Sequence, residues 1–72
     1  MPIRLGDHGD LVARWQHTML QRFRSYAKAA DGGPLRVDGY YGYDDRDVQR
    51  EYERRTGQLV DGIVSDDDLR AL

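Results

Sequence analysis

One nine-residue pattern occurs twice in this chain, at a spacing of 23 residues. The first copy, residues 37–45, reads VDGYYGYDD, and the second copy, residues 60–68, reads VDGIVSDDD. In each copy an Asp-Gly pair favours a turn, and a small residue followed by acidic residues favours the start of a helix. The repeat therefore predicts two turn-to-helix units that dock in the same way against a shared partner.

The residues before the repeat predict that partner, a long amphipathic helix. The apolar side chains recur at steps of three and four, at Val12, Trp15, Met19, Phe23, Tyr26 and Ala30. Gln16 and several charged residues fall on the other faces of this helix. A helix of about five turns is expected by the 3.6-residue period, beginning near Asp10 and fraying toward Ala30. The sequence DGGP at residues 31–34 is expected to end it, since glycine permits a left-handed cap and proline cannot continue a helix.

Two shorter helices follow from the acidic ends of the repeat. The second is expected to run from Tyr43 to about Arg55 and to stop at Gly57. Ser65 is placed to cap a last short helix, whose leucines turn inward. The expected fold class is all-α: residues 1–72 form a single small three-helix domain with two repeated Asp-Gly turn-to-helix units.

Size and charge narrow the classes of function. A chain of 72 residues has room for one small domain with a thin core, so a self-contained active site is not expected. Thirteen acidic and eleven basic residues leave a net charge of −2, which argues against a nucleic-acid-binding surface. There is no cysteine and no long apolar run, so we expect neither disulfides nor a membrane-spanning segment. A binding module is the default expectation.

Metal and catalytic sites find no support in the sequence. A calcium loop needs oxygen ligands at its first, third and fifth positions before a glycine at the sixth. Counting back from Gly39 and from Gly62, only the fifth position carries a carboxylate in each case. The only histidines, His8 and His17, lie nine residues apart with no cysteine to complete a zinc site. No cofactor, no metal and no catalytic residue is therefore expected.

Three segments of the chain carry a family resemblance. Residues 3–16 read IRLGDHGDLVARWQ, residues 37–42 read VDGYYG, and residues 60–64 read VDGIV. These segments resemble, in order, the opening LGxxGxxVxxLQ pattern, the central VDGxFGPxT signature and the closing VDGxVGPxT signature of the peptidoglycan-binding domain of type 1. That family consists of small helical cell-wall modules of bacterial hydrolases and phage endolysins.

The chain also departs from the pattern of this family. The proline that opens each family helix is Tyr43 in one copy and Asp66 in the other, and Ser65 replaces the second glycine. The Phe-Gln pair of the second helix is Tyr-Glu at residues 52–53, and residues 21–34 match no part of the pattern. The substitutes at the helix starts are all compatible with that position, so the resemblance implies that the helical fold is kept.

The resemblance implies a non-catalytic module that recognises peptidoglycan and targets a tethered hydrolase, in a phage endolysin. Ten of the eleven basic residues are arginine and eleven of the thirteen acidic residues are aspartate. Such a bias is typical of a GC-rich genome and indicates an actinobacterial or actinophage source. The expected partners are peptidoglycan, through its stem peptide and glycan, and a covalently linked catalytic domain, with no nucleic acid and no membrane. We expect a monomer at the bacterial cell wall, outside the cytoplasm, delivered from the host cytoplasm if the parent is an endolysin. The alternative is a protein-interaction adaptor on the same scaffold.

The candidate ligand-binding residues are Tyr40, Tyr43 and Asp38. The two tyrosines flank Tyr41, which lies on the apolar period, so their rings are expected to point elsewhere. An exposed tyrosine ring suits stacking on a sugar or packing on a stem peptide, whereas the alternative reading makes both rings half-buried parts of a turn. Asp38 is most simply a turn-forming residue whose carboxylate accepts nearby backbone amides.

Two further expectations concern the framework. The aromatic residues expected in the core are Trp15, Phe23, Tyr41 and Tyr52. Gly39 and Gly62 are expected in equivalent turns with positive φ, a conformation that side chains resist.

Overall fold

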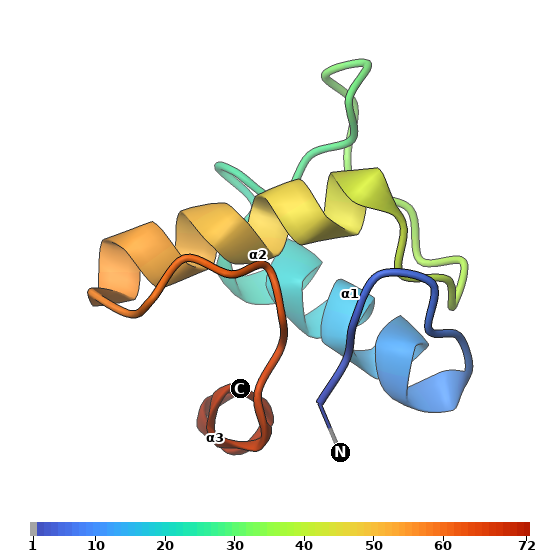
Figure 1. Cartoon of the computed structure of the whole chain (residues 1–72). Helices are drawn as coiled ribbons and strands as arrows, with labels where there is room; N and C mark the ends of the chain where they lie inside the picture. Colours follow the sequence, from blue (N-terminus) through green and yellow to red (C-terminus); the bar gives the residue numbers. More distant parts are fainter. Residues whose placement is uncertain (1) are drawn as a thin grey trace.

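The computed structural model describes residues 2–72, and these form three α-helices without a β-sheet. Helix α1 spans Asp10–Arg22, α2 spans Tyr43–Thr56 and α3 spans Asp66–Ala71. α1 and α3 lie on the same side of α2 (Figure 1). The predicted all-α, three-helix architecture is confirmed.

The segment before α1 ties both repeats together through backbone hydrogen bonds. Ile3 and Val64 exchange two of them, with N···O distances of 2.8 and 2.9 Å. The Gly6 amide donates to the carbonyl oxygen of Tyr41 at 2.9 Å. Tyr41 and Val64 occupy equivalent positions of the repeat, and both are fully buried. The two units are therefore anchored alike, each by its central apolar residue.

The two Asp-Gly turns have the same geometry. Gly39 has a φ of 76° and Gly62 has a φ of 74°, as predicted. The carboxylates of Asp38 and Asp61 each accept a hydrogen bond from the amide two residues later, at 3.0 and 2.9 Å. The turn-forming role expected for these aspartates is confirmed.

Helix α1 is shorter than the apolar period predicted. It ends at Arg22, about two turns before Ala30. Phe23 leaves the helical conformation with a φ of −129°. The Phe23 side chain nevertheless packs against the ring of Tyr52, with centroids 5.4 Å apart. The apolar period of the sequence therefore continues past the end of the helix. An apolar spacing of three and four residues is thus compatible with a loop that lies against the core.

Residues 24–34 form this loop, the green segment between α1 and α2 in Figure 1. Its ends are joined where the Leu35 amide donates to the Ala27 carbonyl oxygen at 3.1 Å, and both side chains are buried. The sequence at residues 31–34 makes the turn of this loop and does not terminate α1, which corrects the expected helix end.

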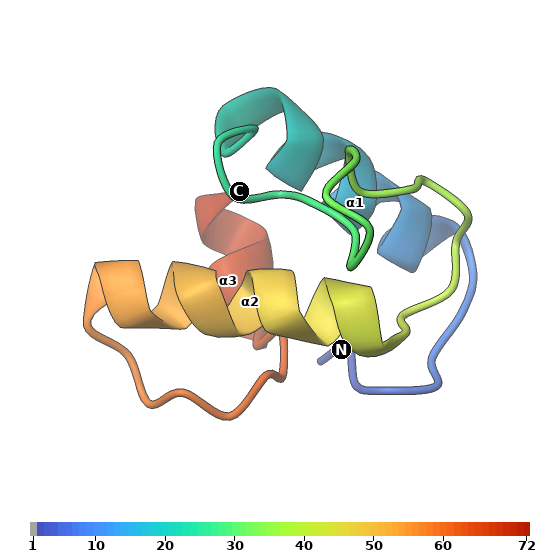
Figure 2. The ribbon, with the colours of Figure 1, turned by 90° about the horizontal axis from the view of Figure 1, so that it is seen from above.

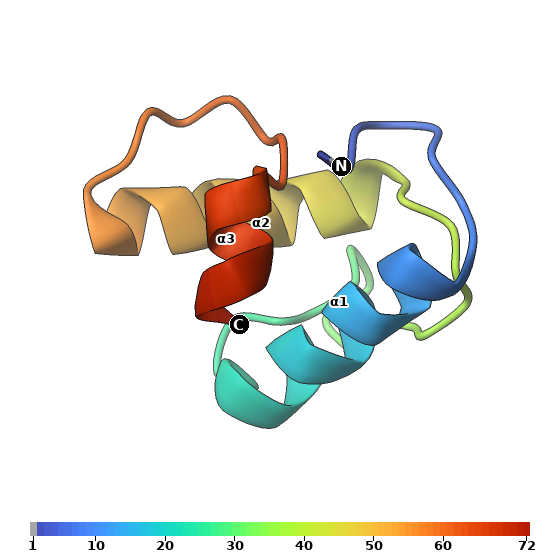
Figure 3. The same cartoon turned by 90° about the horizontal axis from the view of Figure 1, so that it is seen from below.

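The other helix ends lie where the sequence placed them. Gly57 closes α2 in the left-handed conformation, with a φ of 75°. The Ser65 hydroxyl accepts a hydrogen bond from the Asp68 amide at 3.1 Å and caps α3. Between these two caps the chain leaves the end of α2 and returns alongside it, as seen from above in Figure 2 and from below in Figure 3.

The core lies where the two units meet α1. Its buried apolar residues are Ile3, Val12, Trp15, Met19, Ala27, Leu35, Tyr41, Val48, Tyr52 and Val64. Trp15 is 2% exposed and meets the edge of the Tyr41 ring, with centroids 5.2 Å apart. The Tyr41 hydroxyl donates to the carbonyl oxygen of Gly62 at 2.7 Å and so joins the first turn to the second. The core positions of Trp15, Tyr41 and Tyr52 are confirmed, whereas Phe23 is half-buried at the edge of the core.

Candidate ligand-binding site

The three candidate residues line one pocket. It lies beside the start of α2 and has a volume of about 260 Å³. Its walls come from the first Asp-Gly turn, at residues 38–39, from residues 35–36 before that turn, and from the first helical turn of α2. The lining residues are Leu35, Arg36, Asp38, Tyr40, Gly42, Tyr43, Asp44 and Asp45. The structure therefore brings Asp38, Tyr40 and Tyr43 together.

Asp38 is an anion held in place by its neighbours. Its Oδ1 atom accepts hydrogen bonds from the Tyr40 amide at 3.0 Å and from Gln16 Nε2 at 2.9 Å. These two bonds, the amide first, hold the pKa of the Asp38 carboxyl below its usual value. The carboxylate thus shapes the turn and also adds a fixed negative charge to the pocket wall.

Both candidate tyrosine rings reach solvent. Tyr40 is 51% exposed and Tyr43 is 66% exposed. The Arg46 guanidinium lies 5.0 Å from the centre of the Tyr43 ring, in a cation–π contact that covers one face of it. The Tyr40 ring packs over Gly42, where an added Cβ would lie 3.3 Å from a ring carbon. Glycine at this position leaves room for the ring beside the start of α2.

The charge of the pocket is acidic. Asp38, Asp44 and Asp45 line it, and Arg36 is the one basic lining residue. The free backbone amides at the start of a helix can bind a carboxylate ligand. The Gly42 amide instead donates to Asp45 Oδ2 at 2.8 Å. The lining therefore suits amino, amide and hydroxyl groups better than carboxylates.

Gln16 connects this pocket to α1 and was missed by the sequence analysis, which placed it on a polar face. Its side chain is completely buried. Nε2 donates to Asp38 Oδ1, to the Tyr40 carbonyl oxygen and to Asp45 Oδ1 at 2.9, 3.0 and 2.9 Å. Its Oε1 accepts from the Gly39 amide at 2.9 Å. The signal that could have identified it is its place at the end of the opening LGxxGxxVxxLQ pattern.

Asp45 forms the inner end of this network. Burial raises the pKa of the Asp45 carboxyl, and the hydrogen bond from Gln16 acts in the opposite direction. Both of its oxygens are engaged, one by Gln16 and the other by the Gly42 amide. The pocket therefore has a rigid, hydrogen-bonded wall on the side of α1 and exposed tyrosine rings on the side of solvent.

Among residues 2–72, no group of three histidine, cysteine, aspartate or glutamate side chains is arranged to hold a metal ion. No helix among the same residues is both long and apolar enough to cross a membrane.

One solved structure gives the comparison that bears on function. The chain is similar to the crystal structure of the Burkholderia AP3 phage endolysin, with a TM-score of 0.68 and 28% sequence identity. The match covers 94% of this chain and 23% of the endolysin chain. Comparison with protein-family models and with curated proteins gave no match. The chain is therefore similar in fold and sequence to a segment of a phage endolysin, about a quarter of that protein's length.

Proposed function

We propose that this chain is a non-catalytic cell-wall-binding module that recognises peptidoglycan and belongs to a phage endolysin. The observation that carries the proposal is the likeness of 94% of the chain to part of an endolysin at 28% identity. The motif resemblance at residues 3–16, 37–42 and 60–64 supports the same conclusion. Because the chain spans 23% of that endolysin, a covalently linked catalytic domain is part of the proposal.

The pocket at the first turn is the proposed contact with peptidoglycan. Tyr40 and Tyr43 offer exposed rings on which a sugar or a stem peptide can pack. Asp38 adds a fixed carboxylate that accepts hydrogen bonds from amino, amide and hydroxyl groups. A single shallow site of this kind binds weakly, and attachment to a polymer strengthens it through avidity.

The module acts on the tethered enzyme through effective concentration. Binding to an insoluble polymer keeps a linked hydrolase near its substrate without any chemistry in the module itself. The proposed site of action is the bacterial cell wall, which an endolysin reaches from the host cytoplasm. The arginine and aspartate bias adds the proposal of an actinobacterial host.

Sedimentation with purified, protein-free sacculi tests this function. We expect the chain to be retained in the pellet at low salt and to be released by soluble muropeptides in excess. An absence of retention would reject the proposal and favour the protein-interaction adaptor.

A pair of variants tests the proposed site separately. Tyr40→Ala/Tyr43→Ala removes both rings, and Leu59→Ala/Val60→Ala removes two exposed apolar side chains from the loop after α2 as a matched control. We expect the tyrosine variant to lose most of its retention on sacculi and the control to keep it, with unchanged helical circular dichroism in both. Full retention of the folded tyrosine variant would place recognition on another surface.

A further inference from the structure

The two turns are held from inside by different side chains. At the first turn, Gln16 accepts a hydrogen bond from the Gly39 amide through Oε1 and donates to the turn aspartate through Nε2. At the second turn, Glu53 Oε1 accepts from the amides of Asp61 and Gly62 at 3.1 and 2.9 Å. Glu53 thus accepts hydrogen bonds from the turn amides as Gln16 does, but Gln16 also donates a hydrogen bond to the turn aspartate.

The ability to donate a hydrogen bond distinguishes the two side chains. A glutamine amide carries both an acceptor and a donor, whereas an ionised carboxylate only accepts. Glu53 is 2% exposed, so water does not take the place of a partner. Its Oε1 atom binds the backbone amides of Asp61 and Gly62, and the neighbouring Asp61 side chain raises the pKa of Glu53. Asp61 is the residue equivalent to the aspartate to which Gln16 donates. Two ionised carboxylates in this place repel each other, and a proton between them restores the missing hydrogen bond.

Among the described residues no ion pair joins Glu53 to an arginine, whereas a hydrogen bond from Gln49 lowers its pKa. The aliphatic stems of Arg46 and Arg50 cover the turn glycine, but the Arg46 guanidinium pairs with Asp47 at 3.8 Å. The Nε atom of Arg50 is buried without a hydrogen-bond partner. From the first turn, Tyr41 approaches the second turn and donates its hydroxyl to a carbonyl oxygen there.

We propose that Glu53 retains a proton in the folded chain and donates it to Asp61, so that the second turn is locked at mildly acidic pH and loosened when this proton is lost. Oε1 of Glu53 accepts the two backbone amides, so the proton resides on Oε2. This pH dependence is specific to the second Asp-Gly turn, because the amide of Gln16 at the first turn does not titrate.

The expected direction of the pH dependence follows from the two carboxyl groups. Burial, and then the hydrogen bond to Asp61, raise the pKa of Glu53. The same hydrogen bond lowers the pKa of Asp61. The stabilisation from Glu53 is complete below its unfolded pKa of about 4.3 and is lost as the pH rises through its folded value. The stabilisation from Asp61 is present above about pH 3.9 and is lost as the pH falls through its lowered folded value. The second turn is therefore most stable at about pH 4, and its stability declines toward each of the two folded pKa values.

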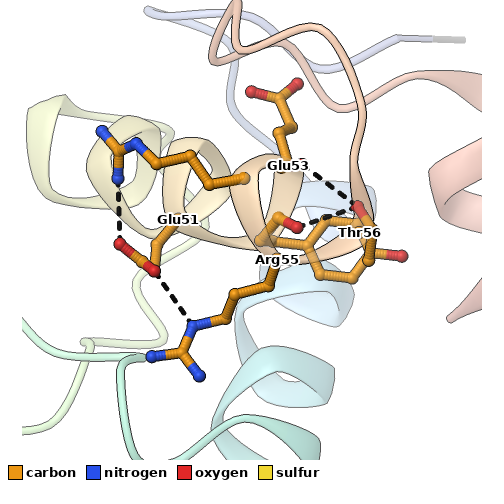
Figure 4. A network of polar contacts seen from close by, with 6 residues as sticks. Glu51, Glu53, Arg55 and Thr56 are labelled. Carbon is orange, nitrogen blue, oxygen red and sulfur yellow. Dashed lines mark hydrogen bonds and ion pairs between the residues drawn. The ribbon is translucent and has the colours of Figure 1, made fainter.

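A charge-matched pair of variants on α2 tests the proposal. Figure 4 shows the Glu53 carboxyl pointing away from Glu51 and Arg55. Glu51 accepts hydrogen bonds from Arg54 and Arg55 at 2.9 and 3.0 Å, and the bond from Arg55 lowers its pKa. Glu53→Gln and Glu51→Gln thus remove the same charge from one helix, with opposite expected effects.

At about pH 7.5 we expect Glu53→Gln to lower the unfolding equilibrium constant by about tenfold, because the amide donates to Asp61 at every pH. At about pH 4 the variant and the parent should agree within about twofold. Glu51→Gln should raise the constant at about pH 7.5, by no more than about fivefold. Burial also raises the pKa of Asp45, but all three proteins share that carboxyl, so its effect cancels in the comparison.

A carboxyl-carbon NMR titration of the parent chain measures the proton directly. We expect the midpoint of Glu53 to lie above that of an ordinary glutamate and the midpoint of Asp61 to lie below that of an ordinary aspartate. A Glu53 midpoint at or below the ordinary value would overturn the proposal. So would a folded Glu53→Gln variant no more stable than the parent at about pH 7.5. If that variant does not fold, the titration of the parent decides alone.

Discussion

The two turn-to-helix units, residues 38–45 and 61–68, share a backbone and differ in what holds it. Their turn glycines have φ values of 76° and 74°. In each unit the aspartate three residues into the helix accepts from the amide of the capping residue, at 2.8 Å for Asp45 and 3.3 Å for Asp68. In the first unit, Gln16 of α1 supports the turn and the helix start through hydrogen bonds to Asp38, to the Gly39 amide and to Asp45. The local residues thus set each turn, and the rest of the fold supplies its support.

The second unit divides the same support between two residues of α2. Glu53 accepts the turn amides, and Gln49 donates to Asp68 at 2.9 Å. The first unit is therefore joined to a different helix, α1, whereas the second is folded back on the helix that precedes it. This difference predicts that damage to the support of the first unit separates α1 from α2, and that damage to the second is more local.

Trp15→Ala should have the largest effect. Trp15 is buried and packs against Tyr41, the central apolar residue of the first unit, with ring centroids 5.2 Å apart. We expect a loss of about 3–5 kcal/mol in the free energy of unfolding, from the buried area removed and the cavity left behind. This is a large part of the roughly 4–11 kcal/mol of stability expected for a chain of 72 residues.

Thermal and urea unfolding followed by circular dichroism measure this loss. Leu59→Ala, at an exposed position in the loop after α2, is the control. Its free energy of unfolding should lie within about 0.5 kcal/mol of that of the parent. A Trp15→Ala variant that melts like the parent would contradict the assignment of Trp15 to the core.

Gln16→Leu and Gln49→Leu compare the two supports directly. Gln16→Leu leaves the buried Gly39 amide and Asp45 carboxylate short of partners, which should cost about 2–4 kcal/mol. Gln49→Leu removes the bond to Asp68, which keeps its bond from the Ser65 amide, and the bond to Glu53, which keeps its bonds from the turn amides. It also removes Gln49 Oε1, a buried atom without a partner. We expect the second variant to cost about 1 kcal/mol.

Chemical denaturation of both variants gives the two losses under the same conditions. Hydrogen exchange adds a spatial test, because the loss in Gln16→Leu should appear at the amides of residues 39–42 and in α1. Equal losses in the two variants would contradict the division of support between the units.

The sequence predicted what neighbouring residues decide. The positive φ of Gly39 and Gly62, the cap at Ser65 and the end of α2 at Gly57 all depend on the residue itself and on two or three neighbours. These signals are local, so one sequence is sufficient to read them. They gave the number of helices and the bounds of α2.

The sequence did not predict what distant contacts decide. Gln16 was placed on a face of the helix away from the apolar stripe, yet its hydrogen-bond partners lie within residues 38–45. The end of α1 was missed because Phe23 keeps the apolar period while its backbone turns into a loop. The apolar period therefore predicts which side chains are buried more reliably than it predicts where the helical backbone ends. Tyr40 and Tyr43 were named because they flank the buried Tyr41, and Asp38 because it forms the turn. Their role in binding stays a prediction.

The smallest expected differences in the free energy of unfolding are those between alanine variants of the turn glycines. Gly39, Gly62 and Gly57 share a φ near 75°, which should cost about 1–2 kcal/mol when alanine replaces any of them. An added Cβ at Gly57 would have no atom within 4 Å, so Gly57→Ala measures this conformational cost alone. At Gly39 the Cβ would lie 3.4 Å from its nearest neighbour, and at Gly62 it would lie 2.6 Å from Arg46 Cγ.

Arg46 Cγ belongs to the stem of a half-buried arginine, so the loss of stability in Gly62→Ala should exceed that in Gly57→Ala by about 1 kcal/mol. The loss in Gly39→Ala should match that in Gly57→Ala within about 0.5 kcal/mol. Urea unfolding of the three variants gives these differences. Equal losses at Gly62 and Gly57 would mean that the Arg46 side chain moves aside without cost, and that the second turn is packed no more tightly than the first.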